Sequence, residues 1–111
     1  MRTLLTIFAL AMSLTTYPAF SMTVTDYMNR KNEKEIGYYI AGVGAGFYYA
    51  MNTAGTMGQR KLYCPAPGAG PSGEFYIKLL DGFLKNQGST IRPDTSVEVI
   101  LLGALMKRFP C

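Results

Sequence analysis

A long uncharged segment is the feature that most constrains the fold of this chain. Residues 36–58 form a run of 23 residues without a formal charge, and their apolar members recur at spacings of three and four. Such spacing places these members on one face of a helix. They are Ile36, Ile40, Val43, Phe47, Ala50, Met51 and Ala54. We therefore predict a helix that begins after Asn32 as N-cap, with Glu35 in the capping-box position, and ends near Met57.

Glycines interrupt this predicted helix. Six glycines lie between Gly37 and Gly58, and each weakens helix propensity by about 1 kcal/mol relative to alanine. Close approach of another helix or of another subunit is the usual compensation. Gly42 and Gly46 lie on a second stripe of the helix, so we predict that they line either an intrachain helix contact or a subunit contact.

A membrane span is the alternative for residues 36–58, because 23 residues are enough to cross a bilayer. The segment contains Asn52, tyrosines, threonines and many glycines, and it has no leucine. This composition is less apolar than that of typical spans. We therefore expect a buried helix of a globular protein.

Residues 1–21 have the layout of a secretory signal peptide. Arg2 provides a positive start, residues 4–14 are apolar, and Ala19-Phe20-Ser21 matches a small-residue cleavage site. The apolar run is too short to serve as a stable membrane anchor. We predict export with cleavage after Ser21, and an uncleaved N-terminal anchor is the alternative.

The mature chain, residues 22–111, contains two cysteines, Cys64 and Cys111. A domain of 90 residues buries a modest share of its surface, so a covalent closure would add needed stability. Export places the thiols in an oxidising compartment. We predict one intrachain disulfide between Cys64 and Cys111, and the alternatives are two free thiols or an intermolecular bridge.

Three further helices are predicted. They cover about residues 25–29, about residues 73–86 after Ser72 as N-cap, and about residues 93–109 before Pro110. No segment of useful length has the period of a strand. The predicted fold is therefore all-α, a small compact bundle of about four helices closed by one disulfide.

The last two predicted helices have distinct faces. Their inward residues are expected to be Tyr76, Leu80, Phe83 and Leu84 in the first, and Val97, Ile100, Leu101, Ala104 and Leu105 in the second. On the outward face, Glu74 precedes Lys78 and Asp81 precedes Lys85 by four residues. Acid-first pairs at this spacing stabilise a helix, so we expect both to form on a solvated surface.

The side-chain inventory excludes several classes of function. The chain has no histidine, which excludes Ser-His-Asp and Cys-His mechanisms and histidine-bearing zinc sites. Residues 42–47 (GVGAGF) lack the preceding strand and the last glycine of a nucleotide-binding loop. The mature chain has a net charge of +3 from scattered basic pairs, so nucleic-acid binding is not expected. We expect no enzyme, no cofactor and no metal site.

Four stretches in a fixed order carry a family resemblance. They read YYIAGVGAGF, LYCPAP, GEFYIKLLDGFL and VEVILLGALMKRFPC, and the similarity extends over essentially the whole mature chain. In this order they resemble the Tai/Rap family of immunity proteins, which accompany type VI secretion amidase effectors. The resemblance implies a periplasmic, all-helical and often dimeric protein that binds and blocks a peptidoglycan amidase. It also implies that Cys64 and Cys111 are the family's paired cysteines.

The leading hypothesis is therefore a periplasmic immunity protein that occludes the active site of an amidase effector. The partner contacts are expected in the loop between the last two predicted helices, at Gln87, Ser89 and Arg92, and beside it at Lys85. A homodimer is an open alternative to a monomer, and no membrane contact is expected after signal cleavage. A periplasmic helical chaperone or stress protein without an amidase target is the second hypothesis, motivated by the Gly- and Met-rich long helix.

Overall fold

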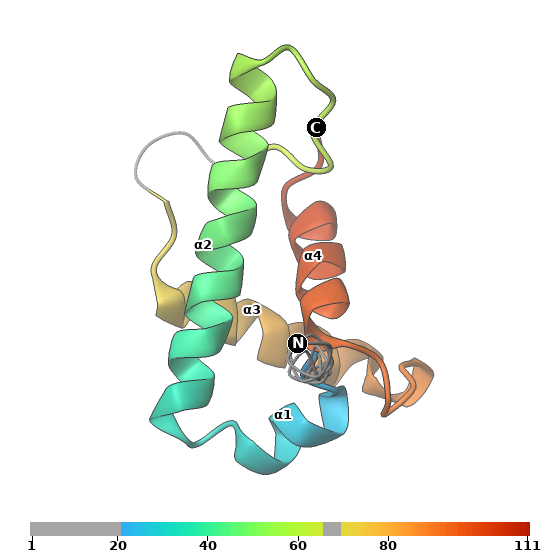
Figure 1. Ribbon diagram of the computed structural model, residues 1–111. Coiled ribbons are helices and arrows are strands. Elements are labelled where there is room, and N and C mark those ends of the chain that lie inside the picture. Colours follow the sequence, from blue (N-terminus) through green and yellow to red (C-terminus); the bar gives the residue numbers. More distant parts are fainter. Residues whose placement is uncertain (1–20, 66–69) are drawn as a thin grey trace, which may run out of the picture.

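The longest element is α2 (Lys34–Thr56), against which α3 (Gly73–Gln87) and α4 (Val97–Arg108) pack (Figure 1). The computed structural model describes residues 21–65 and 70–111, which also contain α1 (Val24–Arg30) and the short 3-10 helix η1 (Gly88–Thr90). The predicted all-α bundle of about four helices is confirmed. The predicted signal peptide lies outside the described residues except for Ser21, and it stays a prediction.

The capping box of this chain lies at α1 and not at α2. The Thr23 hydroxyl accepts a hydrogen bond from the Asp26 N–H, and the Asp26 carboxylate accepts one from the Thr23 N–H. The prediction that Asn32 caps the long helix is wrong. Glu33 is the N-cap, and its side chain makes no capping hydrogen bond, because its carboxylate instead forms an ion pair of 2.9 Å with Arg30.

One face of α2 is buried along most of its length. Its buried residues, Ile36, Ile40, Gly44 and Tyr48, follow one another at intervals of four. Val43, Phe47 and Met51 lie beside them and are partly buried, as the apolar spacing predicts. Ala50 was expected on this face and is exposed. The covered stripe is therefore centred on the line through Gly44.

A left-handed glycine ends α2. Gly58 has a φ of 68°, the conformation in which glycine has no steric cost. The Gln59 N–H donates to the Ala54 carbonyl at 2.8 Å, and the Gly58 N–H donates to the Gly55 carbonyl at 3.2 Å. These two bonds form a Schellman motif, which satisfies carbonyls that the helix end leaves unpaired.

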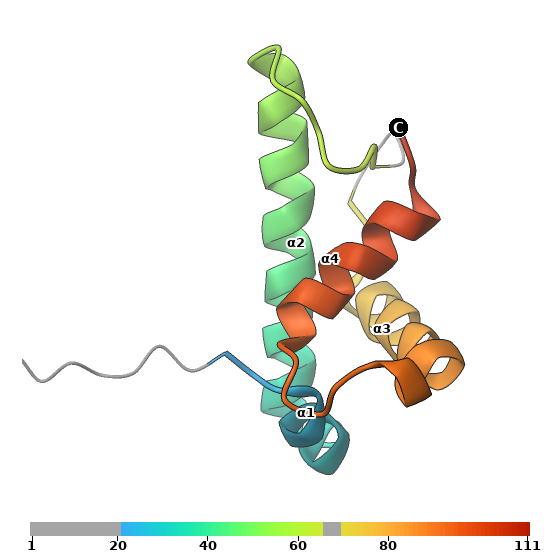
Figure 2. The same cartoon turned by 90° about the vertical axis from the view of Figure 1, so that its right-hand side faces the viewer.

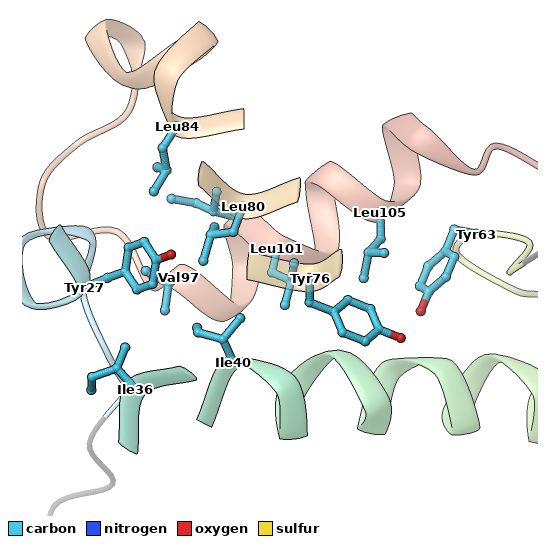
Figure 3. Close-up of a cluster of buried hydrophobic side chains, with 11 residues drawn as sticks. Tyr27, Ile36, Ile40, Tyr63, Tyr76, Leu80, Leu84, Val97, Leu101 and Leu105 are labelled. Carbon is cyan, nitrogen blue, oxygen red and sulfur yellow. The ribbon is translucent and has the colours of Figure 1, made fainter. Parts of the chain in front are cut away.

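The core lies where α2, α3 and α4 meet, with Tyr27 of α1 closing one end (Figure 3). α3 contributes three buried side chains, and α4 contributes all five of the inward residues predicted from its spacing. The Ser72 cap of α3 is also confirmed, since its hydroxyl accepts from the Phe75 N–H at 3.3 Å. The buried core residues from α3 and α4 are Tyr76, Leu80, Leu84, Val97, Ile100, Leu101, Ala104 and Leu105.

Glycine permits the closest helix approach at Gly44. A Cβ added there would lie 2.3 Å from Cγ of the Tyr76 ring. At Gly42 and Gly46, by contrast, an added Cβ would meet no described atom within 4 Å, and both positions are exposed. An intrachain helix contact at Gly42 and Gly46 is therefore not found in the described part of the chain. The subunit contact, the other alternative, stays a prediction.

The predicted disulfide between Cys64 and Cys111 is confirmed, with a Cα–Cα distance of 4.9 Å. It joins the segment after α2 to the end of the chain after α4, which lie side by side in Figure 2. The Cys64 N–H also donates to the Phe109 carbonyl at 2.9 Å.

Among the described residues, no helix has both the length and the apolarity of a membrane span.

Candidate protein-binding site

An exposed connection between the last two helices is the principal candidate for partner binding. We call residues 88–96 the α3–α4 loop; it extends away from α2 at the edge of the molecule (Figure 1). It begins with η1 and ends at Ser96, the N-cap of α4. Its exposed residues are Gly88, Ser89, Thr90, Arg92, Pro93 and Asp94.

Hydrogen bonds within the α3–α4 loop fix its path. The Thr90 hydroxyl donates to the Gln87 carbonyl at 2.8 Å, which ties η1 to the end of α3. A turn follows, in which the Thr95 N–H donates to the Arg92 carbonyl at 3.0 Å. Across the same turn, the Arg92 guanidinium forms an ion pair of 2.9 Å with Asp94. The local sequence therefore encodes two successive turns.

Further hydrogen bonds attach the loop to α1. The N–H and the hydroxyl of Thr25 both donate to the Pro93 carbonyl, each at 3.1 Å. The Val24 N–H donates to the Thr95 carbonyl at 2.9 Å. Ile91 packs against the core, so a partly buried side chain also holds the middle of the loop. The loop is therefore exposed to solvent and yet ordered at several points.

The end of the loop pairs with the segment before α1. Thr23 and Ser96 form an isolated antiparallel bridge. Beside it, the Val97 N–H donates to the Met22 carbonyl at 2.8 Å. This pairing occupies the first free N–H group of α4 and fixes where the loop enters the helix.

A carboxylate completes this junction. Glu98 lies in the first turn of α4 and accepts hydrogen bonds from the Ser96 hydroxyl, the Tyr39 hydroxyl and, at 3.3 Å, the Met22 N–H. Burial disfavours the charged carboxylate, but the bonds from Ser96 and Tyr39 outweigh it and lower the pKa of Glu98 below its usual value. The bond to Glu98, and then burial, raises the pKa of Tyr39 to about 12.

Two grooves lie on either side of α3 near the loop. The α1–α3 groove has a volume of about 490 Å³, and its lining includes Met28, Lys31, Asp81 and Lys85. The α3–α4 groove has a volume of about 400 Å³, and its lining includes Leu79, Phe83, Gln87 and Lys107. The last turn of α3 and the start of the loop thus lie between two grooves with different lining residues.

The four predicted contact residues occupy this end of the molecule without sharing one face. Ser89 and Arg92 are exposed on the α3–α4 loop. Lys85 and Gln87 both belong to the last turn of α3, but they line different grooves. Residues two apart on a helix point about 200° apart, which explains their separation.

The predicted ion pair between Asp81 and Lys85 is wrong. No ion pair joins these residues in the described structure, whereas Glu74 and Lys78 form theirs at 3.4 Å. Asp81 instead accepts a hydrogen bond of 2.6 Å from the Tyr27 hydroxyl. This long-range bond between α1 and α3 draws Asp81 away from the solvated face.

Comparisons with known proteins do not identify this site. No family model, no curated protein and no solved structure gave a significant match to the chain. The resemblance to the Tai/Rap family therefore stays a prediction. Within residues 21–65 and 70–111, no group of His, Cys, Asp or Glu side chains is arranged to hold a metal ion.

Sequence reasoning missed the residues that hold the loop in place. They are Met22, Thr25, Tyr39 and Glu98, whose hydrogen bonds join segments that lie far apart in the sequence. One local signal was present, because Thr23 followed three residues later by Asp26 is a capping pattern that marks the start of α1. The other contacts have no local signal.

Proposed function

We propose that this chain is a periplasmic immunity protein, exported through a cleaved signal peptide, that occludes the active site of a type VI secreted peptidoglycan amidase. One observation carries the proposal: the α3–α4 loop is exposed and also held by hydrogen bonds along its length. The resemblance to the Tai/Rap family supplies the target class. The protein acts by binding and performs no catalysis.

A preordered loop suits this mechanism. A flexible loop loses conformational freedom when it enters a cleft, and that loss weakens binding. The bonds from Thr25 to Pro93 and from Thr90 to Gln87 order the loop before the partner arrives. The loop then enters the substrate cleft of the amidase with little rearrangement and keeps the peptidoglycan strand out.

Ser89 and Arg92 are the loop residues that we assign to the contact. Both are exposed, and Arg92 already points its guanidinium at Asp94, with which it forms an exposed ion pair. Exposed pairs contribute at most about 1 kcal/mol, so the guanidinium can exchange Asp94 for an acceptor on the partner. Lys85 and Gln87 widen the contact to either side of α3.

The test pairs the protein recovered from periplasmic expression with the amidase effectors encoded beside its gene. We expect a stable complex and loss of peptidoglycan hydrolysis at a one-to-one ratio. Arg92→Glu should weaken inhibition by about tenfold, the effect of losing one well-placed interface charge. Arg60→Glu, the same charge change at an exposed position after α2, is the matched control and should inhibit normally.

Two results would contradict the proposal. One is a failure of every adjacent amidase to bind. The other is a complex in which Arg92→Glu and Arg60→Glu inhibit equally, because the α3–α4 loop would then not be the occluding element.

The chaperone hypothesis has one observation in its favour. Tyr38 and Tyr49 are 75% and 68% exposed on α2, and the exposed Gly42 and Gly46 lie between them on the same stripe. A stripe of this kind can hold either a second subunit or an unfolded client. Suppression of aggregation of a heat-denatured client, lost in Tyr49→Asp and retained in Arg92→Glu, would favour a chaperone over an immunity protein.

A further inference from the structure

We propose that the α3–α4 groove binds an acidic segment of a protein partner, with an apolar side chain inserted between the two helices. The inference rests on the chemistry of the groove and stands whether or not the partner is an amidase. Three observations carry it: an apolar surface with room for a side chain, a set of cations at its edge, and amide groups at one end.

The apolar surface comes from both helices. Leu79 and Phe83 of α3 face Ala104 of α4 across the groove. Gly82 lies between the two α3 residues, and an added Cβ there would meet no described atom within 4 Å. The missing side chain at Gly82 thus leaves a hollow in the groove, whose volume of about 400 Å³ is sufficient for one or two side chains.

The charges around this surface have one sign. Lys78, Lys107 and Arg108 line the groove, and no Asp or Glu does so in the described part of the chain. Lys78 pairs with Glu74 at 3.4 Å, but both side chains are 76% exposed, so this pair is weak and easily exchanged. Lys107 and Arg108 make no ion pair with a described residue.

These cations select for carboxylates. A positive edge around an apolar surface attracts a segment in which acidic residues flank an apolar one, and it repels a basic segment. Arg108 lies with its guanidinium carbon 5.3 Å from the centre of the Phe109 ring, so its position is partly fixed before binding. The groove therefore favours one charge pattern in its partner.

The end of the groove nearest the α3–α4 loop favours a polypeptide over a lipid or a nucleic acid. Asn86 and Gln87 line it there, and their amides can both donate to and accept from a peptide backbone. An acyl chain would leave these amides unpaired. Phe83 is the one aromatic residue among the described residues that line the groove, whereas nucleic-acid sites stack successive bases on several exposed aromatics. The occupant we infer is an extended or helical acidic segment of a protein.

The experiment is an NMR titration of the oxidised protein recovered from periplasmic expression. The probe is the peptide acetyl-Glu-Asp-Leu-Phe-Asp-Glu-amide, and its control replaces each acid by the corresponding amide. We expect the acidic peptide to shift the amide signals of Leu79, Gly82 and Lys107. It should bind about tenfold more tightly than the control at low salt, with a difference that shrinks as salt is added.

Two variants separate binding from folding. A Cβ at Gly82 meets no described atom within 4 Å. Gly82→Leu should therefore fill the hollow and abolish the shifts, while the melting temperature stays equal or rises through helix propensity. Lys107→Glu should weaken binding of the acidic peptide, whereas Arg60→Glu, the same charge change after α2, should not.

Several results would overturn the inference. Equal binding of the two peptides would show that the groove does not select acidic residues. Undiminished binding to Gly82→Leu would show that the peptide does not bind in the groove. Shifts spread over the whole surface would indicate nonspecific attraction. Groove shifts produced by myristate micelles and not by the acidic peptide would assign the groove to a lipid.

Discussion

Tyr27 and Tyr63 show how two buried tyrosines in one core differ. They are only 1% and 2% exposed. The Tyr27 hydroxyl donates to Asp81 at 2.6 Å, whereas the Tyr63 hydroxyl has no hydrogen-bond partner among the described residues. Burial raises the pKa of both, to about 12 for Tyr63. A buried hydroxyl without a partner costs stability, so the two residues should respond oppositely to loss of the oxygen.

Tyr27→Phe should lower the free energy of unfolding by about 1–3 kcal/mol, because it removes a hydrogen bond to a charged group. Tyr63→Phe should leave the free energy unchanged or raise it by up to about 1 kcal/mol, because no bond is lost. Urea denaturation of the oxidised proteins measures both. A larger loss for Tyr63→Phe than for Tyr27→Phe would contradict this assignment.

Gly44 and Gly46 of α2 differ in the space around them, so their substitution by alanine should have opposite effects on stability. Gly44→Ala should cost about 1–3 kcal/mol, since its Cβ would collide with the Tyr76 ring and either the ring or the helix must move. Gly46→Ala should stabilise the protomer by up to about 1 kcal/mol through helix propensity. Thermal denaturation of the two variants measures both effects. Equal changes in melting temperature would show that Gly44 of α2 does not pack against α3.

At the scale of elements, the junction of the α3–α4 loop with α4 depends on an ionised Glu98. Its pKa is lowered in the folded protein, so the carboxylate adds stability above the unfolded pKa, near 4.5. That contribution is lost as the pH falls through the lower folded value. Glu98→Gln should therefore be less stable than the parent at pH 7, and its stability should fall less between pH 5 and 3. The free energy of unfolding of the parent and of Glu98→Gln is measured by denaturant titration at each pH. The same pH dependence in both would show that the ionised Glu98 does not stabilise the junction.

Elements differ in how far the sequence predicts them. α3 follows from local signals, namely the Ser72 cap and apolar residues at helical spacing, and its buried face matches the prediction except at Phe83, which is only partly buried. The buried face of α4 also matches, but the predicted start of this helix at Pro93 is wrong, because residues 93–95 form a turn bonded to α1 and the helix begins at Val97. The start of α2 did not follow, because Arg30 holds Glu33 and shifts the cap by one residue. The start of α4 is held by the long-range bond from the Val97 N–H to the Met22 carbonyl, for which the sequence has no local signal.

The candidate site was predicted only in part, for a physical reason. An exposed polar loop after α3 is evident in the sequence, and Ser89 and Arg92 lie on it. Part of its order comes from local bonds, and the rest comes from Thr25 and Glu98, which lie in α1 and α4. Likewise, Gly44 rather than Gly42 or Gly46 meets a neighbouring helix, because tertiary packing decides which stripe of α2 is covered.

At the scale of the whole molecule, the disulfide closes the chain. Cys64 and Cys111 are 47 residues apart, so their bond encloses α3 and α4. Replacing both cysteines by serine should lower the free energy of unfolding by up to roughly 4 kcal/mol, because the unfolded chain regains the freedom of a long loop. Urea denaturation of the oxidised parent and the double variant measures this. An unchanged midpoint would show that closure adds no stability.

Occlusion by the α3–α4 loop is tested most directly by hydrogen–deuterium exchange, measured on the protein alone and with the amidase effector that we propose as its partner. We expect slower exchange across residues 88–96 on binding, greatest at the exposed residues Ser89 and Arg92, with little change on the Tyr38–Tyr49 face of α2. Protection confined to α2, with the α3–α4 loop exchanging as in the free protein, would show that this loop is not the occluding element.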